Sequence, residues 1–192
     1  MPLIDITPPG AEPVTAAEVK AAAKIDGSEF DAQIAIIIPA LRGLAEQKLG
    51  RRLITQTCEL VMDTFPCHGE ICLQVPDVST LSSIKYLDYT TGLEVTLAST
   101  EYVFDGNSTP CRIVPAYGKY WPPTYRTVNA VRVRFICGFG AASTNVPQDI
   151  RHWILAYAAQ ALNNPSGLTL DNLAPLPFVD HLLDRHMVLG CC

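Results

Sequence analysis

The sequence has little positive charge. Its 192 residues contain 14 Lys and Arg against 19 Asp and Glu, which gives a formal net charge of -5, and the cations are not concentrated in one stretch. Tight phosphate binding needs a basic footprint. The composition therefore excludes a dedicated nucleic-acid-binding protein, while a transient or sliding contact with DNA is compatible with it.

Long hydrophobic runs are also missing. The purely apolar runs, such as "IAIII" at Ile34 to Ile38, are far shorter than the roughly 18 to 20 residues that span a bilayer. The opening "MPLIDITPPG" has no basic region followed by an apolar stretch, so we do not expect a signal peptide. We expect a protein made in the cytosol that has no membrane partner.

The cysteines form no disulfide framework. There are seven, an odd number, without a regular spacing, so reduced thiols are expected. Cys67, His68 and Cys72 lie close together, but a zinc site needs four ligands and no second pair has convincing spacing. His181 and His186 are five apart and face different directions on a helix. We predict no metal site and no cofactor.

Enzyme motifs are missing as well. The sequence contains no phosphate loop, no dinucleotide fingerprint and no nucleophile elbow. The glycines of "CGFGA", at 137–141, lack the spacing of a phosphate cradle and suit a turn of the chain. We therefore predict no catalytic residues; a small hydrolase that uses His152 or His181 is the weakest alternative.

Helical signals are present at both ends of the chain. "TAAE", from Thr15, is a capping-box pattern that predicts a helix over residues 15–24. "SEFD", from Ser28, repeats the pattern and predicts a longer helix over 28–49, in which apolar residues keep helical spacing. Pro39 is expected to kink this helix, and Gly50 is expected to end it. Two further helices are predicted at 147–164 and 178–188.

The region between these helices is β-rich. Arg132 and Arg134 alternate with Val131, Val133 and Phe135, which is typical of an antiparallel strand with one buried face. Turn signals such as "TTG" and "FDGNSTP" separate the segments. Strands are expected within 53–62, 70–75, 82–89, 93–97, 101–104, 111–114 and 130–140.

These elements predict an α+β fold. The economical architecture is a helical bundle formed by the N- and C-terminal helices, with an antiparallel β domain inserted between the second and third helices. The expected boundaries are an extended N-terminal arm at 1–14, a helical bundle at 15–50 and 145–192, and a β region at 51–144.

Two surfaces are candidates for partner binding. Arg51 and Arg52 follow the second helix. One interpretation is that they clamp a carboxylate or phosphate of a partner; the other is that they offset the helix dipole. The segment "YGKYWPPTYR" places aromatics beside prolines. It suits stacking on sugars or a peptide, or a loop wedged between subunits.

The order of several motifs resembles a known family. The motifs are "AAEVKAAAKID", "AEQKLGRRLITQT", "CRIVPAYGKYWPP", "NAVRVRFICGFG" before "VPQDIRHWILAYAAQ", and "LPFVDHLLDRHMV". Together they resemble the head-to-tail connector proteins of tailed bacteriophages, also called head-completion or adaptor proteins, over nearly the whole chain.

This resemblance implies a structural virion protein. Such connectors form a ring, dodecameric by resemblance, beneath the portal; the ring joins capsid to tail and continues the DNA channel. The implied partners are the portal protein, a tail terminator or stopper protein, other copies of the chain and double-stranded DNA in passage. Assembly takes place in the host cytoplasm, and the mature location is the virion neck.

The N-terminal arm and the C-terminal helix are the expected portal contacts, and the β region is the expected contact with neighbouring subunits or the tail. The alternative function is a β-rich carbohydrate- or host-binding virion module. The predicted interface residues are Arg51, Arg52, Tyr117, Tyr120, Trp121, Tyr125, Phe178, Leu182, Leu183, Arg185 and Met187.

Overall fold

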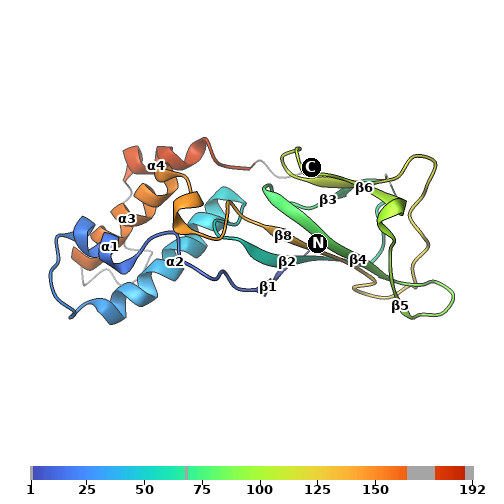
Figure 1. Ribbon diagram of the computed structural model, residues 1–192, viewed down its shortest axis with the longest axis horizontal. Helices are drawn as coiled ribbons and strands as arrows, with labels where there is room; N and C mark the ends of the chain where they lie inside the picture. The colour runs from blue at the N-terminus through green and yellow to red at the C-terminus, as the bar shows by residue number, and fades with distance from the viewer. Residues whose placement is uncertain (1, 68, 164–175, 189–192) are drawn as a thin grey trace. The chain divides into compact units, whose positions relative to one another are not determined.

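The computed structural model describes residues 2–67, 69–163 and 176–188. Over these residues the chain forms four α-helices and two antiparallel sheets (Figure 1), which confirms the predicted α+β class. The chain divides into two compact units. A helical unit contains Gly10–Ile54 and Phe139–Met187, and a β unit contains the residues up to Pro9 and Thr55–Gly138.

Helix α1 (Ala16–Ala23) begins at the predicted capping box. The hydroxyl of Thr15 accepts from the backbone N–H of Glu18 at 3.3 Å, and the backbone N–H of Thr15 donates to the Glu18 carboxylate at 2.8 Å. Glu18 also pairs with Arg151 of α3 (Gln148–Asn163). The cap therefore joins the first helix to the third.

Helix α2 (Asp31–Leu49) begins differently from the prediction. Its N-cap is Phe30, with no side-chain hydrogen bond, so the capping box predicted at Ser28 is wrong. The backbone carbonyl of Ser28 accepts from the N–H of Asp31 at 3.2 Å instead. The helix is continuous through Pro39 and ends at Gly50, whose left-handed φ of 66° confirms the predicted stop.

The core of the helical unit lies between α1, α2, α3 and α4 (Pro177–Asp184). A stripe of α2 at helical spacing faces α3, as the apolar pattern predicted. Trp153 is the largest fully buried side chain of this core. Its other buried members include Val19, Ile34, Ile38, Leu41, Ala45, Leu49, Ile150, Ile154, Ala158 and Leu183.

The β unit contains two antiparallel sheets. The larger has the order β1 (Leu3–Thr7), β2 (Gln56–Met62), β8 (Val131–Cys137), β4 (Val78–Leu87) and β5 (Glu94–Thr96). The smaller has the order β3 (Ile71–Cys72), β7 (Arg112–Pro115) and β6 (Tyr102–Asp105). Two short 3-10 helices occur at Ser99–Glu101 and Ser143–Asn145.

Strand β8 lies in the middle of the larger sheet, and its alternation is as predicted. Val131, Val133 and Phe135 are fully buried, whereas Arg132 and Arg134 are exposed on the outer face. The inner face packs against residues of the second sheet, among them Ile71, Cys111 and Ile113. Strand β8 pairs with both β2 and β4, so it organises the whole sheet.

Candidate functional site

The junction after α2 holds the first predicted interface residues. Arg51 and Arg52 are both half-buried and interact within the chain. The guanidinium of Arg51 lies over the ring of Phe139, 5.2 Å from its centroid. The side chain of Arg51 is therefore packed within the helical unit.

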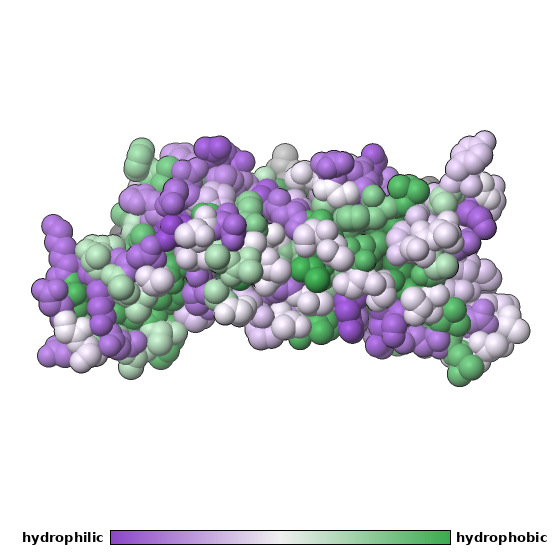
Figure 2. All heavy atoms as spheres, in the orientation of Figure 1, coloured by the Kyte–Doolittle hydropathy of each residue, from purple (hydrophilic) through white to green (hydrophobic). Residues whose placement is uncertain are grey.

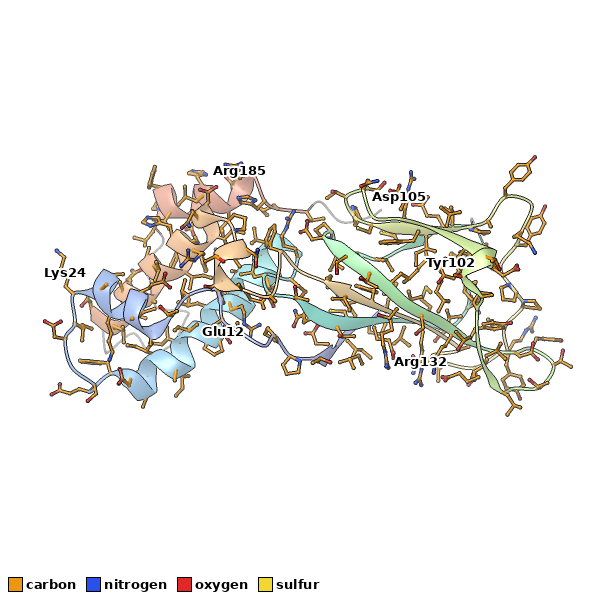
Figure 3. All side chains as sticks on the ribbon, in the orientation of Figure 1. Glu12, Lys24, Tyr102, Asp105, Arg132 and Arg185 are labelled. Atoms are coloured by element: carbon orange, nitrogen blue, oxygen red, sulfur yellow. The ribbon has the colours of Figure 1, made fainter. Side chains whose placement is uncertain are left out.

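A buried carboxylate holds this junction. Glu46 accepts the backbone N–H of Leu53 at 3.0 Å, just after the helix ends. It also lies 3.4 Å from Arg42, which in turn binds Glu12 at 2.9 Å. This network ties residues before α1 to the point where the chain leaves α2; Figure 3 marks Glu12 beside α2. The junction where the chain passes from α2 toward β2 is thus held in place by contacts within the chain.

The aromatic segment is only partly available to a partner. Tyr117 and Tyr120 are almost fully exposed, at 104% and 89%. Trp121 instead stacks on Phe65 with ring centroids 4.9 Å apart, and its indole N–H donates to the carbonyl of Gly69 at 3.1 Å. Trp121 therefore fixes the aromatic segment to the β unit, and the side chains of Tyr117 and Tyr120 are the ones exposed to solvent.

Next to Trp121 lies a groove of about 440 Å³. Aromatic rings and prolines line much of it, and none of the described residues that line it carries a charged side chain. Such a wall suits a flat or extended uncharged ligand. Of the four predicted aromatics, Tyr120 and Trp121 line the groove, while Tyr117 and Tyr125 do not.

The predicted residues of α4 divide between two faces. Leu183 is buried in the helical core, so it holds the helix in place. Phe178 and Met187 are exposed, at 76% and 50%, and Leu182 is half-buried. Arg185 is exposed and pairs with Asp149 at 3.2 Å (Figure 3). The outward face of α4 is the one that a partner can reach.

The sequence analysis missed the residue that anchors α4. Asp180 accepts from the indole Nε1 of Trp153 and the hydroxyl of Tyr157, both at 2.9 Å, and lies 3.7 Å from Lys48. Burial opposes its charge, but these donors and the cation outweigh burial and hold the pKa of Asp180 below its usual range. The sequence does contain a signal for this contact: an acidic residue lies on the apolar face of the last helix, and the preceding helix carries Trp and Tyr side chains that can donate hydrogen bonds to it.

Tyr157 shares this environment. Burial raises the pKa of the Tyr157 hydroxyl, and its hydrogen bond to the Asp180 carboxylate acts in the same direction. The neutral hydroxyl therefore stays a donor to Asp180. It also accepts from the backbone N–H of Leu176 at 3.3 Å, at the start of α4. Tyr157 thus fixes the helix at two points.

The cysteines differ from expectation at one position. Cys58, Cys67, Cys111 and Cys137 are free thiols, whereas Cys72 is disulfide-bonded, so reduced thiols are wrong for Cys72. His68, Cys191 and Cys192 lie outside the described residues.

Few of the described residues are candidates for metal binding or proton transfer. Within the described ranges, no group of three or more His, Cys, Asp or Glu residues is arranged to hold a metal. His181 and His186 hydrogen-bond to different carboxylates, those of Asp184 and Asp149, at 2.9 and 3.3 Å. His152 is exposed on α3.

Of the helices in the described part of the chain, none combines the length and apolar character needed to cross a membrane.

Three solved structures contain chains with the same fold. A chain in the structure described as the neck of an empty gene transfer agent (GTA) particle, computed with C6 symmetry, matches with a TM-score of 0.81 and 20% identity. A chain of the virion of the native particle has a TM-score of 0.80 and 22% identity. A chain of the neck of the native particle, computed with C12 symmetry, has a TM-score of 0.76 and 22% identity.

Each of these matches covers 100% of this chain and 98% of the other. No protein-family model and no curated protein matches the sequence. The whole chain therefore shares its fold with chains of these particles.

Proposed function

We propose that the protein is a structural, non-enzymatic subunit of a virion neck, in which copies form a ring beneath the portal. The observation that carries the proposal is the full-length fold similarity to chains in GTA structures, two of which are of the neck. Those two neck structures were computed with C6 and C12 symmetry, which suits a ring of twelve copies. The succession of connector motifs in the sequence supports the same role.

In this role the ring joins the capsid to the tail and continues the DNA channel. Its partners are the portal protein, a tail terminator or stopper, neighbouring copies and DNA in passage. The net charge of -5 suits a channel that releases DNA, because a basic lining would retain it. The subunit is made in the host cytoplasm and resides in the neck of the finished particle.

The portal contact is proposed for α4 and the N-terminal arm. Phe178 on α4, together with Arg185 and Met187 just after the helix ends, offers exposed side chains for this contact. The arm is held at both ends, since β1 pairs with β2 and Glu12 pairs with Arg42. Residues 8–11 and the exposed side chains of Ile4 and Ile6 on β1 are the parts of the arm proposed for contact. In the proposed architecture the terminal helices surround the portal end, and the inserted β region serves neighbouring subunits or the tail.

A second candidate function rests on the groove beside Trp121. An uncharged aromatic wall with exposed Tyr117 and Tyr120 nearby suits stacking on a carbohydrate of the host surface. In that case the protein is a host-binding module of the virion. Glycan binding by the purified protein, lost on Tyr120→Ala, is the distinguishing result.

Deletion of the gene tests the two functions against each other. A neck subunit predicts filled or leaking heads that accumulate apart from finished tails in electron micrographs. Complementation with the intact gene restores tailed particles. Complete, tailed particles that fail to adsorb to cells contradict the neck role and support the host-binding module.

A further inference from the structure

Exposed apolar side chains gather at one end of the larger sheet. Tyr89 and Leu93, in the turn between β4 and β5, are 58% and 68% exposed. Tyr125 and Val128, in the segment before β8, are 49% and 72% exposed. We call these four residues the apolar tip. Figure 2 shows hydrophobic side chains reaching the surface around β5.

Hydrogen bonds hold the two segments of the tip together. The N–H of Tyr125 donates to the carbonyl of Leu87 at 2.9 Å, and Asp88 forms an antiparallel bridge with Thr124. The Asp88 carboxylate accepts the backbone N–H groups of Thr90 and Thr91 at 3.0 and 2.8 Å, which closes the turn. A preorganised apolar surface loses little entropy when it binds.

Two cations without an ion pair lie beside the tip. Arg126 and Arg132 form no ion pair within the residues that the structure describes. Arg132 lies on the outer face of β8 opposite Lys85, a like charge (Figure 3). Lys85 is itself paired with Glu94 at 2.8 Å. The hydrogen bond from Lys85 and, after it, the positive charge of Arg132 lower the pKa of the Glu94 carboxylate. Neither Arg132 nor Arg126, however, has an ion-pair partner of its own among the described residues.

The neighbouring cation on β8 shows the contrast. Arg134 donates two hydrogen bonds, at 3.0 and 2.8 Å, to the buried carboxylate of Glu59 on β2. Its charge is satisfied within the sheet. Arg126 and Arg132 have no such ion-pair partner among the described residues.

The tip lies at the strand ends remote from the chain's connections to the helical unit. It adjoins the start of β8, where Ala130 accepts from the N–H of Leu87 at 2.9 Å. The chain continues into the helical unit from the other end of β8, after Gly138, and enters β2 from that same end. The connections to the helical unit thus leave the larger sheet at the strand ends opposite the tip.

We propose that the apolar tip, with Arg126 and Arg132, docks a protein of the tail side of the neck, on a surface with an apolar centre and a rim of carboxylates. This inference rests on the proposed function and names the surface that meets the tail. The apolar residues favour a protein over DNA, whose backbone offers phosphates and no apolar counterpart. The unpaired guanidiniums favour carboxylates on that protein.

The test is a double substitution in the virus that encodes the protein. Arg126→Glu with Val128→Asp reverses the charge and removes an apolar contact, on residues that pack against no core. The matched control is Lys24→Glu with Val103→Asp, which alters the charge equally at two other exposed positions. Circular dichroism melting of the purified variants checks that both fold.

Two readouts are needed: the yield of tailed particles by electron microscopy, and the amount of subunit in purified heads by mass spectrometry. The expected result is heads that retain the variant subunit but lack tails, with a tailed yield reduced roughly tenfold or more. The control keeps the tailed yield of the wild type.

Other results overturn the inference in distinct ways. A folded double variant that is lost from heads makes the tip an interface between copies or with the portal. An unchanged tailed yield rejects the docking surface, and so does a normal yield of particles that fail to adsorb or to eject DNA. Absence of the wild-type subunit from every particle rejects the proposed function itself, together with this inference.

Discussion

The carboxylate of Asp180 on α4 accepts a hydrogen bond from the buried indole of Trp153 on α3 at 2.9 Å. The same carboxylate is bound by Tyr157 and lies close to Lys48. A polar network of this kind, set beside buried Leu183, fixes the position of the last described helix. The surface that α4 offers to a portal therefore depends on a residue that itself faces inward.

Replacing Asp180 with alanine is expected to release α4. The donors of Trp153 and Tyr157 lose their acceptor, and an unsatisfied buried donor costs about 1–3 kcal/mol. Hydrogen exchange of the α4 amides, followed by mass spectrometry, measures the release. The control is Asp184→Ala on the same helix, whose partner His181 is exposed. Equal protection in the two variants contradicts the anchoring role.

The two capping patterns are expected to respond differently to substitution. Thr15→Ala removes a cap that the structure forms, and it is expected to lower the free energy of unfolding by about 1 kcal/mol. Ser28→Ala likewise removes a hydroxyl side chain, but one that does not cap α2. Its expected effect is within about 0.5 kcal/mol. Urea unfolding of both variants measures these free energies. A similar decrease in the two variants would show that Ser28 also caps a helix.

Acid is expected to loosen the loop after β6. A hydrogen bond from Ser108, an ion pair with Arg112 and the N–H of Asn107 lower the pKa of Asp105 from 3.8 to about 2. The folded pKa lies below the unfolded one, so the stabilisation is complete above about pH 4 and is lost as the pH falls toward 2. Figure 3 marks Asp105 at the end of this strand.

A carboxyl-carbon NMR titration measures this pKa directly. Asp105→Asn identifies the resonance, and Ser108→Ala is expected to raise the pKa because it removes the 2.6 Å hydrogen bond. A titration midpoint near 3.8 in the wild type speaks against the loop geometry.

The two faces of α4 are expected to separate stability from binding. Leu183→Ala empties a core position and is expected to cost about 2–5 kcal/mol. Phe178→Ala, at a 76% exposed position, is expected to change the free energy of unfolding by less than about 0.5 kcal/mol. It is nevertheless expected to weaken attachment to heads that carry a portal. Co-sedimentation with such heads measures attachment, and wild-type attachment of Phe178→Ala rejects this face as the portal contact.

The long helices and the central strand were predictable because their patterns are local. Helical spacing located α2 and α3, and strict alternation located β8. Ser28 and Thr15 carry the same capping pattern, yet only Thr15 caps a helix, and its capping partner Glu18 is also held by Arg151 from a distant helix. A local pattern does not contain that contact.

The remaining differences also come from distant partners. β1 was not predicted, since "LIDIT" lies in a Pro-rich arm and becomes a strand only by pairing with β2. The segment predicted at 70–75 keeps only Ile71–Cys72 as strand, where β7 provides a partner. Trp121, a predicted interface residue, is stacked on Phe65, and that contact has no local signal either. The sheet order, in which β8 separates β2 from β4, has no local signal.

The central claim is tested most directly by cryo-electron microscopy of wild-type particles, with the neck reconstructed without imposed symmetry. The account predicts a ring between portal and tail whose density fits this fold, with α4 toward the portal and the apolar tip toward the tail. Density for the chain at the tail tip or on a fibre, with none in the neck, would contradict it.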